Sequence, residues 1–236
     1  MGASMQYPWA MQTIVLLSGG LDSATVLAMC LAQGRQCHAL SFRYGQRHKV
    51  ELEAAARIAQ RLGVVSHRVC SIDVQCLAGS ALTGQGEVPK GRSEEIIGQG
   101  IPATYVPARN TLFVAHALGL AESIGAEEIA LGINALDYSG YPDCRPEWLS
   151  AMQEVARLGT KVGVSGQPVK LIAPLVAMSK ADIIRAGTAL GVDFANTLSC
   201  YDPSDDGAAC GACDACILRR LGFEQAGLKD PTRYRG

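Results

Sequence analysis

Four cysteines near the C-terminal end of the chain have the spacing of metal ligands. Cys200 is followed after nine residues by Cys210, and Cys213 and Cys216 follow with two residues between each pair. Four thiolates this close can converge on one ion, and a tetrahedral Cys₄ zinc site is the arrangement that they favour. An iron–sulfur cluster is the rival, because C-x₂-C-x₂-C spacing also occurs in ferredoxin-like sites. A zinc ion with four protein ligands has no open position, so we expect it to be structural.

The string SGGLDS, from Ser18 to Ser23, is a second group of candidate functional residues. It stands where an apolar run passes into a helical pattern, which is where a doubly wound fold places its ligand crevice. Its two glycines let the backbone approach a ligand closely, and the free N–H groups of the following helix attract an anion. The alternative is a tight turn capped by Asp22 and Ser23. We expect a phosphate-bearing cofactor to contact Leu17, Ser18, Gly19, Gly20, Leu21, Asp22, Ser23, Ala24 and Thr25.

The loop lacks the lysine of G-x-x-x-x-G-K-[ST], so it is not a Walker-type loop. SGGLDS after the first strand is similar to the pyrophosphatase-type ATP loop of GMP synthetase, asparagine synthetase, NAD synthetase and tRNA-thiolating enzymes. That resemblance implies cleavage of ATP between its α and β phosphates, which gives an adenylated substrate and pyrophosphate. Mg²⁺ is expected with ATP, and Asp22 is well placed to help hold it.

The elements that must position these residues alternate along the chain. Apolar runs predict strands at 12–17, 37–42, 64–69, 128–133 and 169–172, and periodic patterns predict helices at 24–34, 49–62, 111–124, 147–158 and 180–190. This alternation implies a doubly wound α/β fold, with a mainly parallel sheet and helices on both faces.

Two parts of the chain do not follow the alternation. We expect residues 12–195 to form a nucleotide-binding domain, and residues 196–236 to form a small metal-binding and helical extension packed on it. Residues 79–102 are rich in glycine and polar residues. That segment is too long for an ordinary connection, which indicates a mobile lid or a disordered loop.

Composition narrows the class of protein. The 236 residues are 48% hydrophobic and 18% charged, which is typical of a globular domain with a substantial core. The net charge is -1, and without a run of like charges the chain indicates neither a nucleic-acid partner nor a membrane surface. A small-molecule substrate is favoured. No apolar run approaches the roughly 18 residues that span a bilayer, and no signal peptide is evident, so we expect a cytoplasmic protein.

Further strings settle on one family. The 7-cyano-7-deazaguanine synthases of queuosine biosynthesis resemble this chain in FRYGQRHKVELEAA at 42–55, YVPARNTLF at 105–113, GINALDYSGYPDCRPEW at 132–148, TLSCY at 197–201, ACGACDACILRRLGF at 209–223 and DPTRY at 230–234. The likeness runs from Ile14 to Tyr234, and only residues 79–102 are uninformative. Ala108 departs from the pattern, because the family usually has glycine there, and the loop of Arg109 could therefore sit differently.

The resemblance implies a ligase that uses ATP to convert 7-carboxy-7-deazaguanine and ammonia to the 7-cyano compound, a precursor of queuosine. A carboxylate is a poor electrophile, and transfer of AMP to its oxygen creates a leaving group that ammonia can displace. The resulting amide would be adenylated in turn and would eliminate to the nitrile. The resemblance also suggests a homodimer. A glutaminase would need a nucleophilic cysteine with a histidine partner, and neither is evident, so ammonia is expected to enter free.

Three charged residues are candidates for catalysis. Lys180 begins a capped helix, and Lys180 and Arg109 could neutralise the polyphosphate while Asp22 helps to hold Mg²⁺. For any single lysine or arginine the alternative is a solvated charge.

The string DYSGYPDCR offers contacts for a purine-like substrate. Asp137 or Asp143 could accept hydrogen bonds from the ring N–H and the exocyclic amine, and Tyr138 or Tyr141 could stack on the bicycle. Loop caps and ordinary packing are the alternatives for these four residues. The sequence does not choose between the two carboxylates.

Two other functions fit parts of the sequence. A tRNA-thiolating enzyme shares the ATP loop and often uses cysteines, but it would need a basic tRNA-binding extension that this near-neutral chain lacks. A zinc-ribbon binding module with a vestigial nucleotide domain would use the cysteine segment to bind nucleic acid or a partner. Lysine and arginine are sparse around Cys200 to Cys216 until Arg219 and Arg220, which argues against that module.

Overall fold

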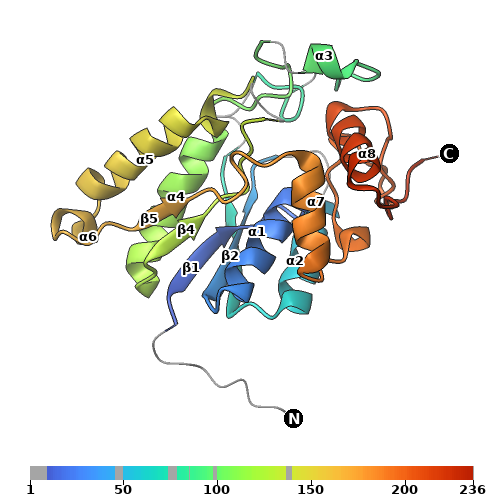
Figure 1. The fold of residues 1–236 in the computed structure, drawn as a ribbon. Helices are drawn as coiled ribbons and strands as arrows, with labels where there is room; N and C mark the ends of the chain where they lie inside the picture. The colour runs from blue at the N-terminus through green and yellow to red at the C-terminus, as the bar shows by residue number, and fades with distance from the viewer. Residues whose placement is uncertain are drawn as a thin grey trace.

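A five-stranded sheet forms the centre of the computed structural model, which describes residues 10–45, 50–73, 79–84, 86–97, 100–136 and 140–235 (Figure 1). The strand order is β3-β2-β1-β4-β5 and all neighbouring strands are parallel. Chain order reverses between β1 and β4, which is where a doubly wound sheet binds its ligand. The strands are β1 (Gln12–Leu16), β2 (Gln36–Arg43), β3 (Ser66–Ser71), β4 (Glu128–Ala130) and β5 (Lys170–Ile172).

Helices cover both faces of this sheet. The described helices are α1 (Leu21–Ala32), α2 (Val50–Leu62), α3 (Glu94–Ile97), α4 (Arg109–Ile124), α5 (Pro146–Gly159), α6 (Lys161–Val164), α7 (Lys180–Ala189) and α8 (Asp214–Ala226), with 3₁₀ turns at Pro142–Cys144 and Phe194–Asn196. Successive strand residues point to opposite faces. On β1, Ile14 packs in a core with α4 and α5, whereas Val15 packs in a second core with α1, α2 and α7. The predicted doubly wound α/β fold is therefore confirmed.

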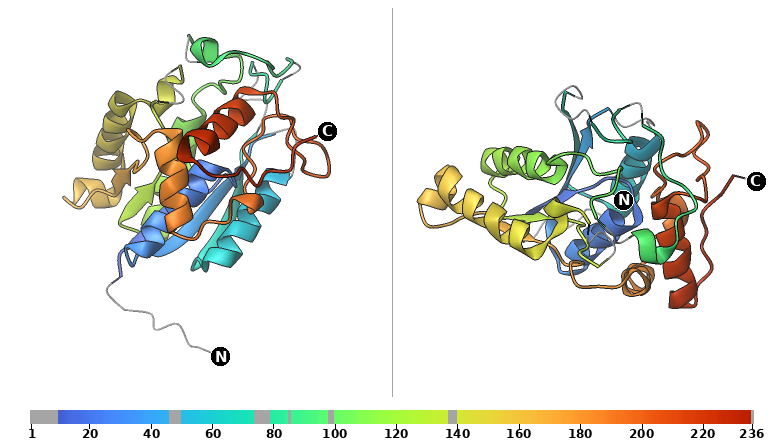
Figure 2. Two further views of the ribbon diagram at one scale, coloured as in Figure 1. Left: turned by 45° about the vertical axis from the view of Figure 1, so that its right-hand side comes forward. Right: turned by 90° about the horizontal axis from the view of Figure 1, so that it is seen from above.

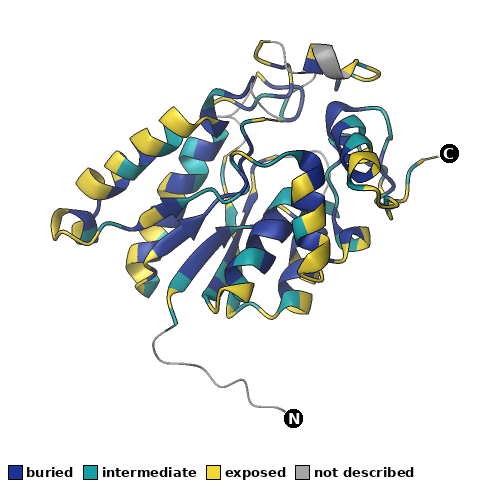
Figure 3. Ribbon diagram, viewed as in Figure 1, coloured by how far each residue is buried: buried dark blue, intermediate teal, exposed yellow. Residues whose placement is uncertain are grey.

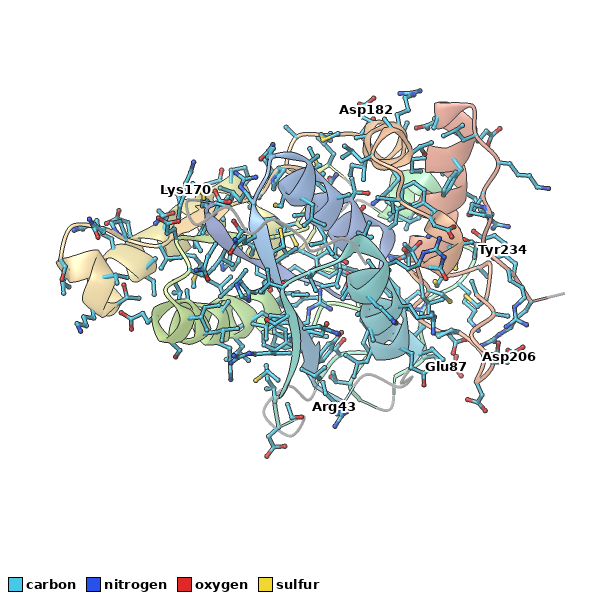
Figure 4. All side chains as sticks on the ribbon, turned by 90° about the horizontal axis from the view of Figure 1, so that it is seen from below. Arg43, Glu87, Lys170, Asp182, Asp206 and Tyr234 are labelled. Carbon is cyan, nitrogen blue, oxygen red and sulfur yellow. The ribbon has the colours of Figure 1, made fainter. Side chains whose placement is uncertain are left out.

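Burial follows from this layering. Strands β1, β2 and β4 and the helix sides that face the sheet are largely buried, while edge strand β3 and the outer sides of α2, α5 and α7 are more exposed (Figure 3). Charged side chains such as Lys170 of β5, Asp182 of α7 and Asp206 lie exposed at the periphery (Figure 4). Among the described residues, no helix is long and apolar enough to cross a membrane.

The predicted elements are present in the expected order, with different ends. The helix expected from residue 24 begins at Leu21, because Gly20 is its N-cap and the glycine loop enters the helix directly. The strand expected to reach residue 133 ends at Ala130, although the Leu131 N–H still donates to the Ile172 carbonyl at 2.9 Å. The capped start of α7 is confirmed, since the Ser179 hydroxyl accepts from the Asp182 N–H at 3.2 Å.

The last forty residues pack beside the sheet domain. Helix α8 lies against α7, as Figure 2 shows from two sides. Arg219 of α8 is 3% exposed and donates to Asp230, to the Thr197 hydroxyl at 2.8 Å and to the Phe194 carbonyl at 2.9 Å. A buried guanidinium with three partners is costly to separate from them, so the described part of the extension is firmly joined to the residues that lead into it.

Candidate functional site

A cavity of about 210 Å³ lies at the C-terminal edge of the sheet, where chain order reverses. Leu16 and Leu17 at the end of β1 and Gly132 and Ile133 after β4 form part of its wall. The SGGLDS loop that continues β1, the end of β2 with Tyr44, the start of α2, Leu82, the start of α4, Tyr141 with Cys144, and the residues on both sides of Cys200 form the rest. Eight separate parts of the chain therefore meet at one place.

The two glycines of the loop have different roles. Gly19 has a φ of +87°, and a Cβ there would lie 2.4 Å from the Glu51 carbonyl oxygen and 2.8 Å from the Ala55 nitrogen, so only glycine fits. Gly20 has a φ of -83°, and its Cβ would lie 3.4 Å from the Ser18 hydroxyl, an ordinary contact. Gly19 is required by the packing of the loop on α2, whereas Gly20 lines the cavity and could carry a Cβ in ordinary contact with its neighbours.

Hydroxyl groups hold the loop in shape. The Ser18 N–H donates to the Ser23 hydroxyl at 3.2 Å, and that hydroxyl donates to the Gly20 carbonyl at 3.1 Å. The Leu21 N–H donates to the Ser199 hydroxyl at 3.3 Å. The loop residues that line the cavity are Leu17, Ser18, Gly20, Leu21, Asp22 and Ser23, whereas Ala24 and Thr25 are fully buried in α1 and are not part of the wall.

Asp22 and Lys180 form an ion pair at the edge of the cavity. The Lys180 Nζ donates to both Asp22 carboxylate oxygens, at 2.8 and 2.9 Å, and both side chains are largely buried. Gly222 of α8 makes room for the lysine, because a Cβ there would lie 2.3 Å from the Lys180 Cγ. Two predicted catalytic residues, 158 positions apart in the chain, are thus in direct contact.

Arg109 begins α4 and contributes its side chain to the cavity wall. Its guanidinium lies over the rings of Tyr44 and Phe113, at 5.7 and 5.9 Å from their centroids, and donates to the Tyr44 hydroxyl at 3.3 Å. The buried Nε has no hydrogen-bond partner among the described residues. A buried donor without a partner is unfavourable, so this position suits an anionic ligand that would complete its hydrogen bonding.

The residue before Arg109 has a backbone conformation that favours glycine. Ala108 has a φ of 52° and is the one described non-glycine residue with positive φ. Its N–H donates to the Tyr105 hydroxyl at 3.0 Å. The left-handed conformation costs an alanine roughly 1 kcal/mol, which the surrounding loop must offset.

Aromatic rings form one side of the cavity. Phe42 at the end of β2 stacks on Phe113 of α4 with centroids 4.0 Å apart and planes 3° apart, and Tyr44 lies 5.5 Å from the same Phe113 ring. These three residues were not predicted from the sequence. Phe42 and Tyr44 lie at the end of a strand, and Phe113 lies one helical turn after Arg109. These positions in the sequence could have indicated that the three rings are near the site.

Glu51 is a further residue of the cavity that was not predicted from the sequence. It lies in the first turn of α2 and is part of the cavity wall. Burial raises the pKa of its carboxyl group from 4.5 to about 7, although the positive charge of Arg109 opposes this. A carboxyl group that titrates near neutral pH within a cavity is a candidate for proton transfer.

The substrate residues predicted from DYSGYPDCR lie in different environments. Tyr141 lines the cavity, and its hydroxyl is 2.6 Å from that of Thr104. Asp143 is buried, and its carboxylate accepts from the Asn110 N–H at 3.0 Å, at the start of α4. Asp137 and Tyr138 lie outside the described residues. Cys144, which follows Asp143, also lines the cavity, and burial raises its pKa to about 12.

The four cysteines at the C-terminal end come together as predicted. The Sγ atoms of Cys200, Cys210, Cys213 and Cys216 all lie within 4.8 Å of one another, so they could hold a metal ion. Backbone N–H groups point at the sulfurs: the Cys210 N–H donates to Cys200 at 3.1 Å, and the Cys213 N–H donates to Cys210 at 3.3 Å. Hydrogen bonds from Cys200 and Cys216 lower the pKa of Cys213. This donor set suits a thiophilic ion.

The cysteine segment also holds the long connection between residues 79 and 102. The Gly91 N–H donates to the Ala212 carbonyl at 2.9 Å, and Lys90 pairs with Asp202 at 2.8 Å. Arg92 forms a two-point ion pair with Asp214, which is 7% exposed. The described part of this connection is packed against the extension, so the expectation of a disordered loop is wrong for these residues. Leu82 of this connection is buried and lines the cavity.

Comparison with known proteins identifies the family of this chain. The model of the family described as "Queuosine biosynthesis protein QueC" matches residues 12–227. The chain is 55% identical over 224 residues to a 7-cyano-7-deazaguanine synthase of Pseudomonas fluorescens (strain SBW25), covering 94% of this chain and 98% of that protein. It is 56% identical over 225 residues to a 7-cyano-7-deazaguanine synthase of Ralstonia nicotianae, covering 95% and 99%.

Solved structures with a related arrangement are more distant. The NMN synthetase of Francisella tularensis is 17% identical with a TM-score of 0.48, and the alignment covers 96% of this chain and 81% of that chain. A 4-thiouridine synthetase, solved as an RNA complex with bound ATP, is 18% identical with a TM-score of 0.47, covering 77% and 41%.

Proposed function

The chain belongs to the family of queuosine biosynthesis protein QueC, and on that premise we propose that it is an ATP-dependent 7-cyano-7-deazaguanine synthase. It would convert 7-carboxy-7-deazaguanine and ammonia to the nitrile through adenylated intermediates. The observation that carries this proposal is the convergence of the SGGLDS loop, the Asp22–Lys180 pair and Arg109 on one cavity. The family match favours this function over a tRNA-thiolating enzyme or a zinc-ribbon module.

The loop would hold the phosphates of ATP. The start of α1 presents backbone N–H groups and the positive end of a helix dipole, and Gly20 lines the cavity beside them. The hydroxyl of Ser18, which lines the cavity, would add a hydrogen bond.

Lys180 and Arg109 would stabilise the charge that develops on the phosphates. The Lys180 Nζ is 2.8 Å from Asp22, so it is held at the loop before ATP binds. Preorganised cations of this kind act most strongly where water is excluded. The Nε of Arg109, which has no hydrogen-bond partner among the described residues, supports a second anion contact in the same cavity.

Mg²⁺ would be held by Asp22 together with the phosphates. A bound cation there would supply charge neutralisation and orientation of the polyphosphate. Both Asp22 oxygens accept from Lys180, so the lysine would turn from the carboxylate toward the phosphates when the cation binds.

The heterocycle would lie against aromatic side chains of the cavity. Tyr44, Phe113 and Tyr141 offer apolar faces with polar edges, as flat heterocycles require. Asp137 or Asp143 would accept from the ring N–H and exocyclic amine, and Tyr138 would stack on the ring. The contact of Asp143 with the Asn110 N–H supports a further role in holding the start of α4.

The chemistry balances with two ATP molecules. A carboxylate oxygen attacks the α phosphate and releases pyrophosphate, and ammonia then displaces AMP with that oxygen to give the amide. The amide oxygen attacks a second ATP, and loss of AMP and a proton from the resulting adenylated imidate forms the C≡N bond. Each AMP thus leaves with one of the two original carboxylate oxygens.

The proposal also covers the metal, the domain organisation and the oligomeric form of the protein. Zn²⁺ would be the ion held by Cys200, Cys210, Cys213 and Cys216, and it would cross-link the extension without touching substrate. Residues 12–195 would form the nucleotide-binding domain and residues 196–236 an extension in the same globular unit, as the packing of α8 on α7 supports. A cytoplasmic homodimer that uses free ammonia is the form that the family resemblance supports.

Isotope labelling tests the proposed chemistry. With ¹⁸O in both carboxylate oxygens of 7-carboxy-7-deazaguanine, we expect one label in each AMP and two AMP per nitrile. Label in inorganic phosphate with ADP as coproduct would overturn adenylation. Failure of the synthetic amide to react would overturn the two-step path.

Substitution of the ion pair tests the assigned residues. Lys180→Met should lower carboxylate-dependent ATP–pyrophosphate exchange by about 10²-fold or more, while Lys161→Met on the exposed helix α6 should not. Equal exchange by both variants would contradict a role for Lys180 at the phosphates.

A further inference from the structure

Glu51 occupies a position in the cavity that the proposed reaction does not yet use. Its carbonyl oxygen lies against Gly19, so close that a Cβ on that glycine would be 2.4 Å away. This contact fixes the first turn of α2 beside the phosphate loop. The Glu51 side chain lines the same cavity as Ser18, Asp22 and Arg109.

The carboxyl group is available to a ligand. Two influences act on its pKa: burial raises it to about 7, and the charge of Arg109 lowers it. No hydrogen bond from a described residue contributes. By contrast, the other carboxylate of the wall, Asp22, accepts two hydrogen bonds from Lys180.

The remaining ionisable groups of the cavity wall are less suited to exchanging a proton near neutral pH. Burial raises the pKa values of Tyr44 and Tyr141, and that of Cys144 to about 12, so these groups keep their protons. The ionisable groups that face the cavity with Glu51 are Asp22 of α1, Tyr44 after β2, Arg109 of α4, and Tyr141, Cys144 and Tyr201 from the later loops.

The reaction needs a proton acceptor at this place. Like other simple amines, ammonia is mostly protonated at neutral pH, and ammonium has no lone pair with which to attack an acyl adenylate. A negatively charged group near the activated carbonyl would attract ammonium and take its proton. The loop that would hold the α phosphate is adjacent to Glu51.

We propose that Glu51 is the acid–base residue that binds ammonium and converts it to ammonia beside the acyl adenylate, an inference that rests on the proposed function. One N–H bond of ammonium breaks and its proton goes to the Glu51 carboxylate. The freed lone pair forms the C–N bond, and the C–O bond to AMP breaks with its electron pair on the phosphate. The proton that the amide nitrogen then loses goes to solvent, and Glu51 releases its own to restart the cycle.

Three reactions of the full-length protein separate this role from nucleotide binding. They are ATP–pyrophosphate exchange with the carboxylate substrate and no ammonia, amide formation with ammonium, and hydroxamate formation with hydroxylamine. Hydroxylamine is a weaker base that is mostly unprotonated at neutral pH, so it needs no base before it attacks. Glu51→Gln keeps the size of the side chain and removes its acid–base function. Glu53→Gln is the matched control, because Glu53 lies in the same first turn of α2 and is exposed.

We expect Glu51→Gln to leave exchange within about threefold of the parent protein and to lower amide formation by about 10²-fold or more. Hydroxamate formation should remain within about tenfold, and Glu53→Gln should match the parent throughout. At fixed total ammonia, the parent rate should level off above about pH 7. The Glu51→Gln rate should keep rising with pH as free ammonia forms.

Different results overturn different statements. Equal losses of Glu51→Gln in all three reactions would assign Glu51 to nucleotide binding or structure. Unchanged amide formation would also overturn the inference. Absence of exchange in the parent protein would overturn the proposed function itself.

Discussion

The cysteine cluster and the cavity differ in how their parts are distributed along the chain. The four cysteines fall between positions 200 and 216, and their sulfurs converge because the chain folds back on itself locally. The cavity wall draws on residues from Leu16 to Tyr201 that only the crossing of chain order between β1 and β4 brings together. A site built from near neighbours is specified by spacing, whereas a site built from distant segments is specified by topology.

The two regions are nevertheless joined. Leu198 lies two residues before the first cysteine, and its N–H donates to the Gly19 carbonyl at 2.9 Å. Arg92 and Asp214 link the connection that contains Leu82 to the start of α8. The cysteine cluster therefore supports part of the cavity wall.

Removal of a metal ligand should have the largest effect. Cys213→Ala should release the proposed metal and lower stability by roughly 4 kcal/mol or more, because a metal held by the four cysteines would contribute its binding free energy to the folding of this segment. Thermal unfolding and metal analysis measure both effects, and one zinc per chain is expected in the parent protein. Cys70→Ala, outside the cluster and partly exposed, is the control. Stoichiometric iron with a brown chromophore would contradict zinc, and an unchanged Tm would contradict structural support.

The paired glycines should separate folding from ligand binding. Gly19→Ala should destabilise by about 3 kcal/mol, because its Cβ meets the backbone of α2 at 2.4 Å and its φ is +87°. Gly20→Ala should stay within about 0.5 kcal/mol of the parent protein and weaken ATP binding instead. Gly20→Val should abolish turnover while the zinc content stays unchanged. Urea unfolding and ATP titration decide the matter, and the reverse ranking of the two alanine variants would show that the loop is only a turn.

The link between the two regions should contribute a smaller amount. Arg92→Ala leaves the buried Asp214 without its ion-pair partner and should cost about 2 kcal/mol, with faster proteolysis between residues 79 and 102. Arg157→Ala removes an exposed pair with Glu154 and should cost less than about 0.5 kcal/mol. Equal Tm values for the two variants would mean that the cysteine segment does not hold the connection.

The last expected effect is a pH dependence of stability that belongs to the cavity. The folded pKa of Glu51, about 7, exceeds its ordinary value of 4.5, so between these values the folded protein binds more protons than the unfolded chain. Its stability contribution therefore falls as pH rises from about 4.5 to about 7. The Tm of Glu51→Gln should exceed that of the parent by a few degrees at pH 8 and match it at pH 4. A difference at pH 4 as large as at pH 8 would rule out Glu51 as the source.

Sequence patterns were enough for the elements and for the continuous motifs. The apolar run of β1 and the Ser179 cap of α7 are local features, so spacing predicted them with small errors at their ends. The family could be named for the same reason, since its strings are continuous. The four cysteines converge because few residues separate them.

The tertiary structure decided which side chains share the cavity. That Lys180 pairs with Asp22 depends on the contact of α1 with α7 and on Gly222, which no spacing in the sequence relates to position 180. Glu51 carried no motif of its own, and its pKa is a property of its burial in the folded protein. Local propensity and ligand spacing are properties of near neighbours in the chain, whereas desolvation and long-range charge pairing exist only once distant segments have packed together.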